Sequence, residues 1–293
     1  MKNILFLLFL AFFLACPVQK AKATGQTPER IIINGDTLSL FALPLSYLDS
    51  VTYKRFCKTL SGRMISTGLW RNYVGEWEVK DSTLYLNKVV RYFRIPEEDT
   101  FTNAMDAKLL EKYKDQKGIK ASWFSGNIRC GKGKIVQYEH MGFNYFLEYE
   151  TIYTLKEGKI VSSVDYHNTI QYDTSPISSA EALGECIRTN FRAEKFPELK
   201  SDSVWSILYL TVTPDKDGNV EQLKYRMHVN YKEYANAPDM ENPFEKEILR
   251  CLKLRKWPVI TVHGKIQNIT SRIGLGKRIP KNGMNKWNTN LKK

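Results

Sequence analysis

Two-residue turns divide residues 28–170 into short apolar runs, and this pattern constrains the fold more than any other feature of the sequence. The turns lie at Asn34-Gly35, Asp81-Ser82 and Glu157-Gly158. Asn-Gly is the strongest two-residue hairpin signal, because both of its positions accept a positive φ angle. Short runs between such turns are typical of antiparallel strands. The sequence therefore predicts a β-rich domain over residues 28–170, with one helix at residues 103–116.

The second half of the chain has a different pattern. Residues 178–181 have the Ser-x-x-Glu sequence of a capping box, and an apolar helical face follows them. Apolar and polar residues alternate over residues 222–229 and again over residues 268–275, as in strands with one solvated face. Between these runs, Asn242-Pro243 provides a cap and a first-turn proline for a second helix. Residues 178–278 are therefore expected to form a separate helix–strand–strand–helix–strand domain.

The start of the chain has the anatomy of a secretory signal peptide. Lys2 precedes an apolar run at residues 4–15, which is shorter than the roughly 20 residues of a membrane-spanning helix. Two cleavage sites compete. Ala21-Lys22-Ala23 fits an ordinary signal peptidase, whereas the sequence ending at Cys16 resembles a lipobox in which that cysteine would be lipidated. We expect residues 1–23 to be a signal peptide, and the protein to be periplasmic, secreted or lipid-anchored in the outer membrane.

Export changes what the cysteines are expected to do, because an oxidising compartment favours disulfides over catalytic thiols. Four cysteines follow Cys16, and they permit three pairings. The division into two domains favours the pairs Cys57–Cys130 and Cys186–Cys251. Four buried side chains that never pair are the alternative interpretation.

The charge balance points to an anionic surface in the cell envelope. The formal net charge is +13 at pH 7, which in a cytosolic chain would suggest nucleic acid. For an exported chain, anionic lipid, lipopolysaccharide or peptidoglycan is the expected counter-surface, and no nucleic-acid partner is expected. The basic residues are spread along the sequence, so no dedicated polyanion site is predicted. The basic tail at residues 279–293 is interpreted as a solvated terminus.

The motifs of the common enzyme classes do not occur in this sequence. It has no phosphate-binding loop, nucleophile elbow or zinc-binding helix. Glu148 and Glu150 lie on one side of an expected strand, where paired carboxylates could serve acid–base chemistry. A solvated strand face is the commoner reason for such a pair. We therefore expect no enzyme, no catalytic residue, no metal site and no cofactor.

Residues 178–278 resemble the TonB C-terminal domain family. The resemblance rests on the order and spacing of short motifs: Lys195-Phe196-Pro197, residues 210–215, 218–220 and 244–248, Arg255-Lys256-Trp257-Pro258, and Gly264-Lys265. It implies a two-layer α/β domain with helices on one face of a small antiparallel sheet. The whole chain is then expected to be an α+β protein, with this domain after the β-rich N-terminal one. The N-terminal part resembles exported Bacteroides-type proteins of unknown role, which implies no activity.

The family also implies a mode of binding. Its members bind outer-membrane transporters by strand addition, in which a short transporter segment pairs with an exposed sheet edge. The resemblance implies that the last strand is this edge, with Ile269, Ser271, Ile273 and Leu275 on one face. Because the chain has no proline-rich spacer, we expect a stand-alone binding module rather than a force-transmitting transducer. The alternative is an exported small-ligand carrier or enzyme with its site in residues 28–170.

Overall fold

The computed structural model describes residues 24–59, 66–92, 101–103, 107–139, 141–172, 178–199, 206–230, 232–235 and 242–275. The expected signal peptide with Cys16, and the basic tail, lie outside the described residues. The described residues form two compact units, called here the barrel unit and the C-terminal unit. The barrel unit takes the described residues up to 132, with 138–145 and 151–164. The C-terminal unit takes residues 133–137, 146–150 and the described residues from 165 onward.

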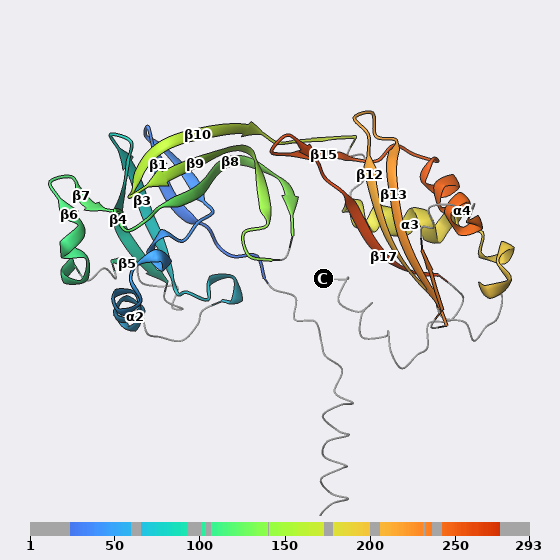
Figure 1. Ribbon diagram of the computed structural model, residues 1–293, viewed down its shortest axis with the longest axis horizontal. Coiled ribbons are helices and arrows are strands. Elements are labelled where there is room, and N and C mark those ends of the chain that lie inside the picture. Colours follow the sequence, from blue (N-terminus) through green and yellow to red (C-terminus); the bar gives the residue numbers. More distant parts are fainter. Residues whose placement is uncertain are drawn as a thin grey trace, which may run out of the picture. The chain divides into compact units, whose positions relative to one another are not determined.

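Seven longer strands build the barrel unit (Figure 1). They are β1 (Glu29–Ile33), β2 (Asp36–Leu40), β3 (Tyr73–Lys80), β4 (Thr83–Tyr92), β8 (Gly126–Tyr138), β9 (Tyr145–Lys156) and β10 (Lys159–His167). Three short strands extend this sheet: β5 (Phe101–Asn103), β6 (Lys114–Asp115) and β7 (Gly118–Lys120). The connections hold helix α2 (Ser50–Thr59) and the 3-10 helices η1 (Pro44–Tyr47), η2 (Thr67–Leu69) and η3 (Ala107–Tyr113).

The expected α+β class is wrong, because the protein is mostly β. Strands hold 51% of the described residues and helices of all kinds hold 24%, and seven strands close into a barrel. The strand order is β10-β9-β8-β2-β1-β3-β4, and β4 pairs back with β10 at Thr83 and Lys159. Closure of a sheet on itself removes its free edges. The helix–strand α/β layout does not describe this chain, in which the described residues hold only three α-helices.

The predicted two-residue turns are confirmed, and one of them closes the barrel. Asn34 and Gly35 have φ angles of 52° and 86°, and the other two turns are likewise positive at both positions. Gly158 has a φ of 76°, and a Cβ atom there would lie 2.7 Å from the carbonyl oxygen of Ala121. Its oxygen accepts from Leu84 N and its N–H donates to Phe124 O, both at 2.8 Å. Only glycine fits this turn, because the main chain of Ala121 approaches so closely.

The predicted helix at residues 103–116 is wrong. The described part of this stretch holds the end of β5, the seven-residue 3-10 helix η3 and the short strand β6. Asp115 Oδ1 accepts from the N–H groups of Lys117 and Gly118, so the chain turns into β7 where a helix would have continued. Helix α2, which the sequence analysis did not predict, packs its Phe56 edge-on against Tyr73, with 5.3 Å between ring centroids.

Large side chains fill the core of the barrel unit. They come from α2 and from every strand of the ring except β10. The following core side chains are each 2% exposed or less: Ile31, Leu40, Phe56, Tyr73, Trp77, Leu84, Ile128 and Leu155. Protein interiors are packed as densely as organic crystals, so this core leaves little of the barrel interior to solvent.

The C-terminal unit contains two separate sheets. The larger is antiparallel, in the order β14-β13-β12-β17. Its strands are β12 (Ser206–Pro214), β13 (Val220–Val229), β14 (Lys232–Ala235) and β17 (Ile269–Leu275). The smaller sheet has β11 (Thr169–Gln171), β15 (Val259–Val262) and β16 (Lys265–Ile266). Neither β14 nor this second sheet was foreseen, and they raise the strand content above the expected pattern.

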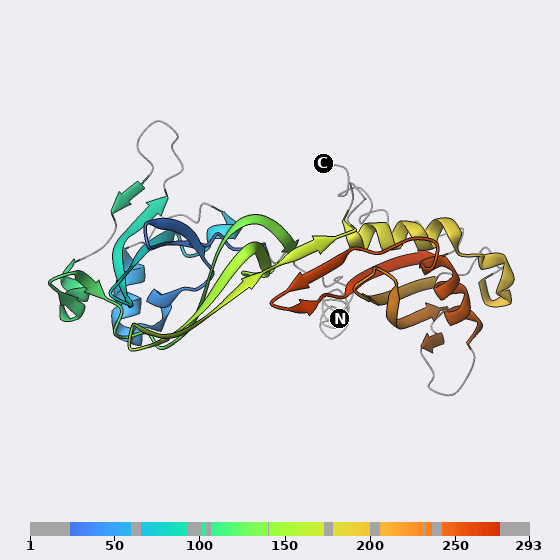
Figure 2. The ribbon, with the colours of Figure 1, turned by 90° about the horizontal axis from the view of Figure 1, so that it is seen from above.

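The two helices of the C-terminal unit begin at the caps that the sequence predicts. Helix α3 (Ser179–Asn190) begins after Ser178, whose Oγ accepts from Glu181 N at 3.3 Å. Helix α4 (Pro243–Leu252) begins after Asn242, whose Oδ1 accepts from Phe244 N at 2.9 Å. Figures 1 and 2 show α3 running along one face of the larger sheet. The 3-10 helices η4 (Ala193–Lys195) and η5 (Pro197–Leu199) follow α3.

Candidate functional site

Strand β17 is one edge of the larger sheet of the C-terminal unit. Among the described strands it pairs with β12 alone, in a register that runs from Val212 opposite Ile269 to Ser206 opposite Leu275. Ile269, Ile273 and Leu275 are buried and Ser271 is half-buried, whereas Thr270 and Arg272 are exposed. The predicted common face of these four residues is therefore confirmed, and it is the inner face. A partner at this edge would meet the main chain and the exposed side chains of β17.

Helix α3 holds the inner face of β17. A Cβ atom at Gly184 of α3 would lie 3.3 Å from Ser271 Oγ and 3.0 Å from the Arg188 guanidinium. Two small residues thus face each other where the helix and the strand approach most closely. Because the inner side chains of β17 pack against α3 and the core, its main-chain groups and the exposed side chains of Thr270 and Arg272 are what a partner at this edge would contact.

The expected disulfides do not form in this structure, since all four cysteines of the described residues are free thiols. Cys57 is exposed on α2, whereas Cys130 is fully buried in β8. Cys186 and Cys251 are neighbours, but the Cys186 thiol donates to the carbonyl oxygen of Cys251 at 3.4 Å and not to its sulfur. Burial raises the pKa of Cys251 to about 11 and also raises that of Cys186, so both thiols stay protonated.

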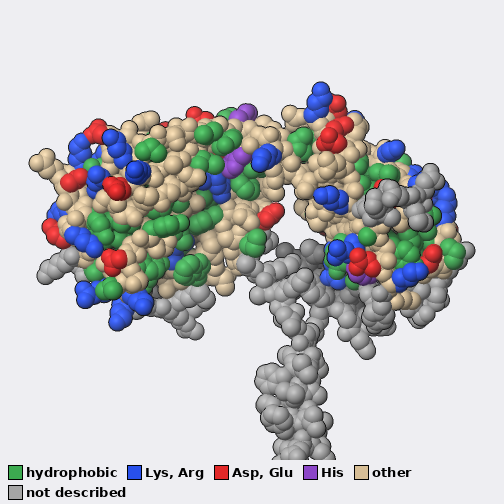
Figure 3. Space-filling model, viewed as in Figure 1, with side chains coloured by type: hydrophobic (Ala, Val, Ile, Leu, Met, Phe, Trp, Pro, Cys, Tyr) green, Lys and Arg blue, Asp and Glu red, His purple; other side chains and the backbone are tan. Residues whose placement is uncertain are grey.

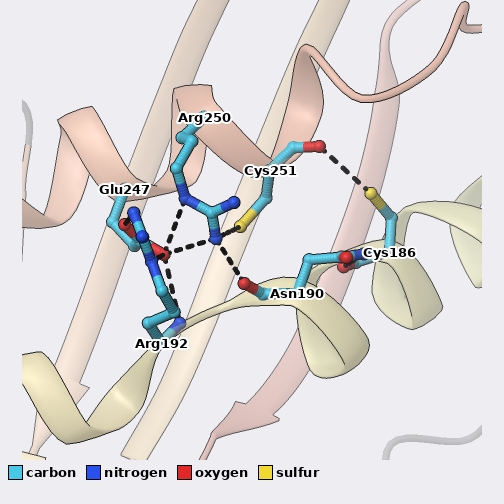
Figure 4. Close-up of polar contacts among 6 residues, drawn as sticks. All are labelled: Cys186, Asn190, Arg192, Glu247, Arg250 and Cys251. Carbon is cyan, nitrogen blue, oxygen red and sulfur yellow. Dashed lines mark hydrogen bonds and ion pairs between the residues drawn. The ribbon is translucent and has the colours of Figure 1, made fainter.

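Glu247 of α4 joins two arginines beside these cysteines (Figure 4). Its side chain is only 6% exposed. Arg192 donates from Nε to Oε1 at 2.9 Å and from Nη2 to Oε2 at 2.7 Å, and its main-chain N–H donates to Oε1 at 3.1 Å. Arg250 donates to Oε1 from Nε at 3.0 Å and from Nη2 at 2.6 Å. These bonds, those from Arg192 most, hold the pKa of Glu247 well below its usual range.

The same arginines line a groove of about 420 Å³ between the end of α3 and the start of α4, called here the α3–α4 groove. Lys195 and Lys246 add two further cations, and Glu247 is the one carboxylate of the lining. Phe196 and Pro243 complete it. The sequence analysis did not find this group, because its members lie in two segments about 50 residues apart. The sequence offered one indication of this group: Glu247 is a charged residue on the apolar face of α4, next to Ile248.

Glu150 is the second buried carboxylate of the C-terminal unit, and its interpretation as part of a solvated face is wrong. It is 2% exposed, and its Oε2 lies 2.7 Å from Nε2 of His263. Asn168 donates to Glu150 Oε2 at 3.1 Å and accepts from the main-chain N–H of His263 at 2.9 Å. A carboxylate that orients a histidine occurs in acid–base sites. Here the hydrogen bonds among Glu150, Asn168 and His263 link β9 to the β15–β16 turn. We therefore interpret these three residues as stabilising the structure rather than as an acid–base site.

Glu29 is a buried carboxylate of a different kind, in the core of the barrel unit. It is 0% exposed, and its Oε2 accepts from Trp77 Nε1 at 2.6 Å. The nearest cation, Arg71 Nε, lies 3.6 Å from Oε1, and the Arg71 side chain is itself only 1% exposed. Burial raises the pKa of Glu29 to about 7, and Arg71 and Trp77 only partly offset it. A Cβ at Gly75 would lie 2.6 Å from Trp77 Nε1, so only glycine leaves room for this bond.

The fold and these clusters define a mostly β protein whose C-terminal unit has a basic groove and, among the described strands, a sheet edge at β17 with one neighbour. Comparison with protein-family models, curated proteins and solved structures finds no match. The resemblance to the TonB C-terminal domain family therefore stays a prediction from sequence. Within the described part of the chain, no helix is long and apolar enough to span a membrane. The same residues contain no cluster of three or more His, Cys, Asp or Glu side chains suited to a metal ion.

Proposed function

We propose that this protein is an exported protein-binding module that receives an extended segment of a partner along the outer edge of β17. The observation that carries the proposal is the position of β17, which among the described strands has β12 as its one neighbour. An edge strand presents a row of main-chain donors and acceptors, and strand addition uses these groups for affinity. The resemblance to the TonB C-terminal domain family favours the same edge.

The composition of β17 supports this use. Native edges are usually blunted by proline, by bulges or by charged side chains. No proline and no positive φ angle occur between Ile269 and Leu275, and the register with β12 is continuous. The one charged side chain, Arg272, lies over the ring of Tyr209 on the neighbouring strand, 5.7 Å from its centroid. It is thereby held against its own sheet, and the edge stays open.

The proposed partner is an outer-membrane transporter of the TonB-dependent class, and the proposed location is the periplasm or the cell surface. Both follow from the resemblance and from the expected signal peptide. Lipidation at Cys16 would tether the module to the outer membrane, where its basic surface would face anionic lipids. A nucleic-acid partner is no part of this proposal.

The alternative, a ligand carrier or enzyme with its site in residues 28–170, has less support. Its cavity would have to lie within the barrel, where Trp77, Tyr73 and Phe56 are packed against one another. Ligand sites of barrels are concave and hold room for most of the ligand surface. We therefore place the binding function on the C-terminal unit.

Proline substitutions at neighbouring positions of β17 provide the test. In a strand, successive residues direct their main-chain groups to opposite sides. One of the variants Thr270→Pro and Ser271→Pro therefore removes a bond to β12, while the other removes only an outward donor and is tolerated by an edge strand. Urea unfolding identifies the tolerated variant. The full chain and this variant are then used to capture transporters from a solubilised bacterial envelope, and hydrogen exchange reports the protection of β17 amides.

We expect the wild-type chain to retain a transporter whose binding slows exchange in β17 and leaves β14, the other edge, unchanged. The tolerated proline variant should lose most of this capture while keeping wild-type stability. Equal capture by both chains, or protection at β14 instead of β17, would show that strand addition at this edge is not the function.

A further inference from the structure

The α3–α4 groove concentrates positive charge that is otherwise dispersed. On the face drawn in Figure 3, lysine and arginine side chains are spread over the surface and are interspersed with acidic ones. In the groove, four cationic side chains and one carboxylate line a volume of about 420 Å³. Cations thus outnumber carboxylates in this lining, which favours an anionic ligand.

Glu247 sets the position of two of these cations in advance. Its two oxygens accept all the bonds described above, so it holds the guanidinium groups of Arg192 and Arg250 in one arrangement. Arg250 Nη2 also donates to the carbonyl oxygen of Asn190, which ties the end of α3 to α4. Because these side chains are already ordered, binding a ligand costs less conformational entropy than it would on a free surface.

Each guanidinium keeps donors for a ligand. Nη1 of Arg192 and Nη1 of Arg250 make no hydrogen bond within the described part of the chain, and the side chains are 40% and 35% exposed. In Figure 4, one terminal nitrogen of Arg250 has no dashed line to it. A guanidinium has five N–H donors in a rigid plane, so its unused edge can bind a second oxyanion while the other edge stays on Glu247.

Two apolar residues, the largely buried Phe196 and the exposed Pro243, complete the lining of the groove. The Phe196 ring stacks on Phe191 and on Phe244, with ring centroids 5.3 and 4.4 Å away. Pro243, the first residue of α4, lies beside it in the lining. A ligand in this groove therefore meets cations on its anionic end and an aromatic–proline surface on the rest.

We propose that the α3–α4 groove binds a phosphate monoester, with the phosphate between the guanidinium and ammonium groups and its organic substituent over Phe196 and Pro243. A phosphate monoester carries close to two negative charges at neutral pH, so it attracts these cations more strongly than one carboxylate does. Its three oxygens also match the bidentate geometry of arginine. Small-molecule sites measure about 300–1,000 Å³, and the groove falls within this range.

Calorimetric titration of the full chain with phenyl phosphate tests the proposal, with benzoate as the monoanionic comparison. The double variant Lys195→Gln, Lys246→Gln removes two cations of the groove and leaves the Glu247 bonds in place. Its matched control is Lys216→Gln, Lys265→Gln, which removes the same charge from two exposed positions of the same unit, the turn before β13 and strand β16. A third ligand, dihexanoyl phosphatidic acid below its micelle concentration, distinguishes a lipid headgroup from a soluble ester as the source of the phosphate.

We expect phenyl phosphate to bind more tightly than benzoate, and the groove variant to weaken its binding about tenfold, which is equivalent to about 1.4 kcal/mol. The control variant should change it less than twofold. Tighter binding of phosphatidic acid would identify a lipid headgroup, and tighter binding of phenyl phosphate a soluble ester. Absence of binding, or equal weakening by both double variants, would overturn the proposal. None of these substitutions touches β17, so the outcome is independent of strand addition.

Discussion

Glu29 of the barrel unit and Glu247 of the C-terminal unit are both buried carboxylates beside arginine, yet their pKa values are displaced in opposite directions. Burial raises the pKa of Glu29 to about 7, whereas hydrogen bonds hold that of Glu247 well below its usual range. The side chains differ little in exposure, at 0% and 6%. The difference therefore lies in what surrounds each carboxylate.

The number and geometry of the charge-assisted bonds decide the direction. Glu247 accepts from two guanidinium groups that are themselves 40% and 35% exposed, so the cations keep part of their hydration. Glu29 accepts hydrogen bonds from two neutral groups, the Trp77 indole and the main chain of Gly75, and its arginine, 3.6 Å away, is almost fully buried as well. Removing two charges from water costs several kcal/mol for each ion, and only close, well-aligned bonds offset this. The C-terminal unit provides such bonds and the barrel unit does not.

The largest effect is expected from Glu29→Gln. With a native pKa of about 7 and an ordinary value of 4.5, the stabilising contribution of the protonated Glu29 is fully present below pH 4.5. It is lost as the pH rises through 7, which amounts to about 3 kcal/mol. Glutamine does not titrate, so the variant should lack this loss. Urea unfolding at pH 4.5, 6 and 8 should show the variant gaining about 3 kcal/mol relative to the wild type.

The control for this change is Glu76→Gln, which removes a carboxylate from β3 that is 18% exposed and pairs with Arg30 and Lys88. Because this change breaks two ion pairs, it should not stabilise the protein at pH 8. If the difference between Glu29→Gln and the wild type stayed constant from pH 4.5 to 8, Glu29 would have an ordinary pKa. The contrast between the two units would then be lost.

A smaller effect of the opposite sign is expected from Glu247→Gln. Because its native pKa is lowered, the ionised Glu247 stabilises the fold above the ordinary value of 4.5, and this contribution is lost as the pH falls below it. Hydrogen bonds to charged groups contribute about 1.5–3 kcal/mol, so the variant should lose about 2 kcal/mol at pH 7. Urea unfolding at pH 7 and at pH 3 measures the change.

The exposed Glu185 on α3 provides the matched control, and Glu185→Gln should leave the stability within about 0.5 kcal/mol. The deficit of Glu247→Gln should shrink at pH 3, where protonation of Glu247 in the unfolded wild-type chain lowers the stability of the wild type but not that of the variant. A deficit that grew on acidification would contradict the lowered pKa and would place Glu247 in the same class as Glu29.

The burial of both carboxylates could have been predicted from the periodicity of the sequence. In β1, Glu29 lies two residues from Ile31, so the period of a strand places both on the buried face. In α4, Glu247 lies three residues after Phe244 and four before Cys251, on the apolar face of the helix. A charged residue at a core position of a periodic pattern predicts a buried charge. Its partners Arg71 and Arg192 are 42 and 55 residues away, so their identity could not be read locally.

Features that depend on neighbouring residues could be predicted, whereas the fold class depends on contacts between distant residues and could not. The Asn34-Gly35 turn and the Ser178 cap depend on neighbouring residues, and both are confirmed. Closure of the barrel depends on the pairing of Thr83 with Lys159, two strand ends 76 residues apart that no local pattern connects. Edge strands such as β14 and β16, with four and two residues, are too short to show an alternating pattern.

The smallest effect is expected from Arg192→Lys, which tests whether geometry or charge lowers the pKa of Glu247. Lysine keeps the positive charge but cannot donate from Nε and Nη2 to both carboxylate oxygens. Because the Arg192 side chain is 40% exposed, solvent screening should keep the loss of stability at pH 7 below that of Glu247→Gln. Arg188→Lys on the exposed face of α3 is the control, and a double-mutant cycle with Glu247→Gln isolates the pair. If Arg192→Lys matched its control and the cycle showed no coupling, charge alone would hold Glu247 ionised, and the bidentate bonds would add nothing.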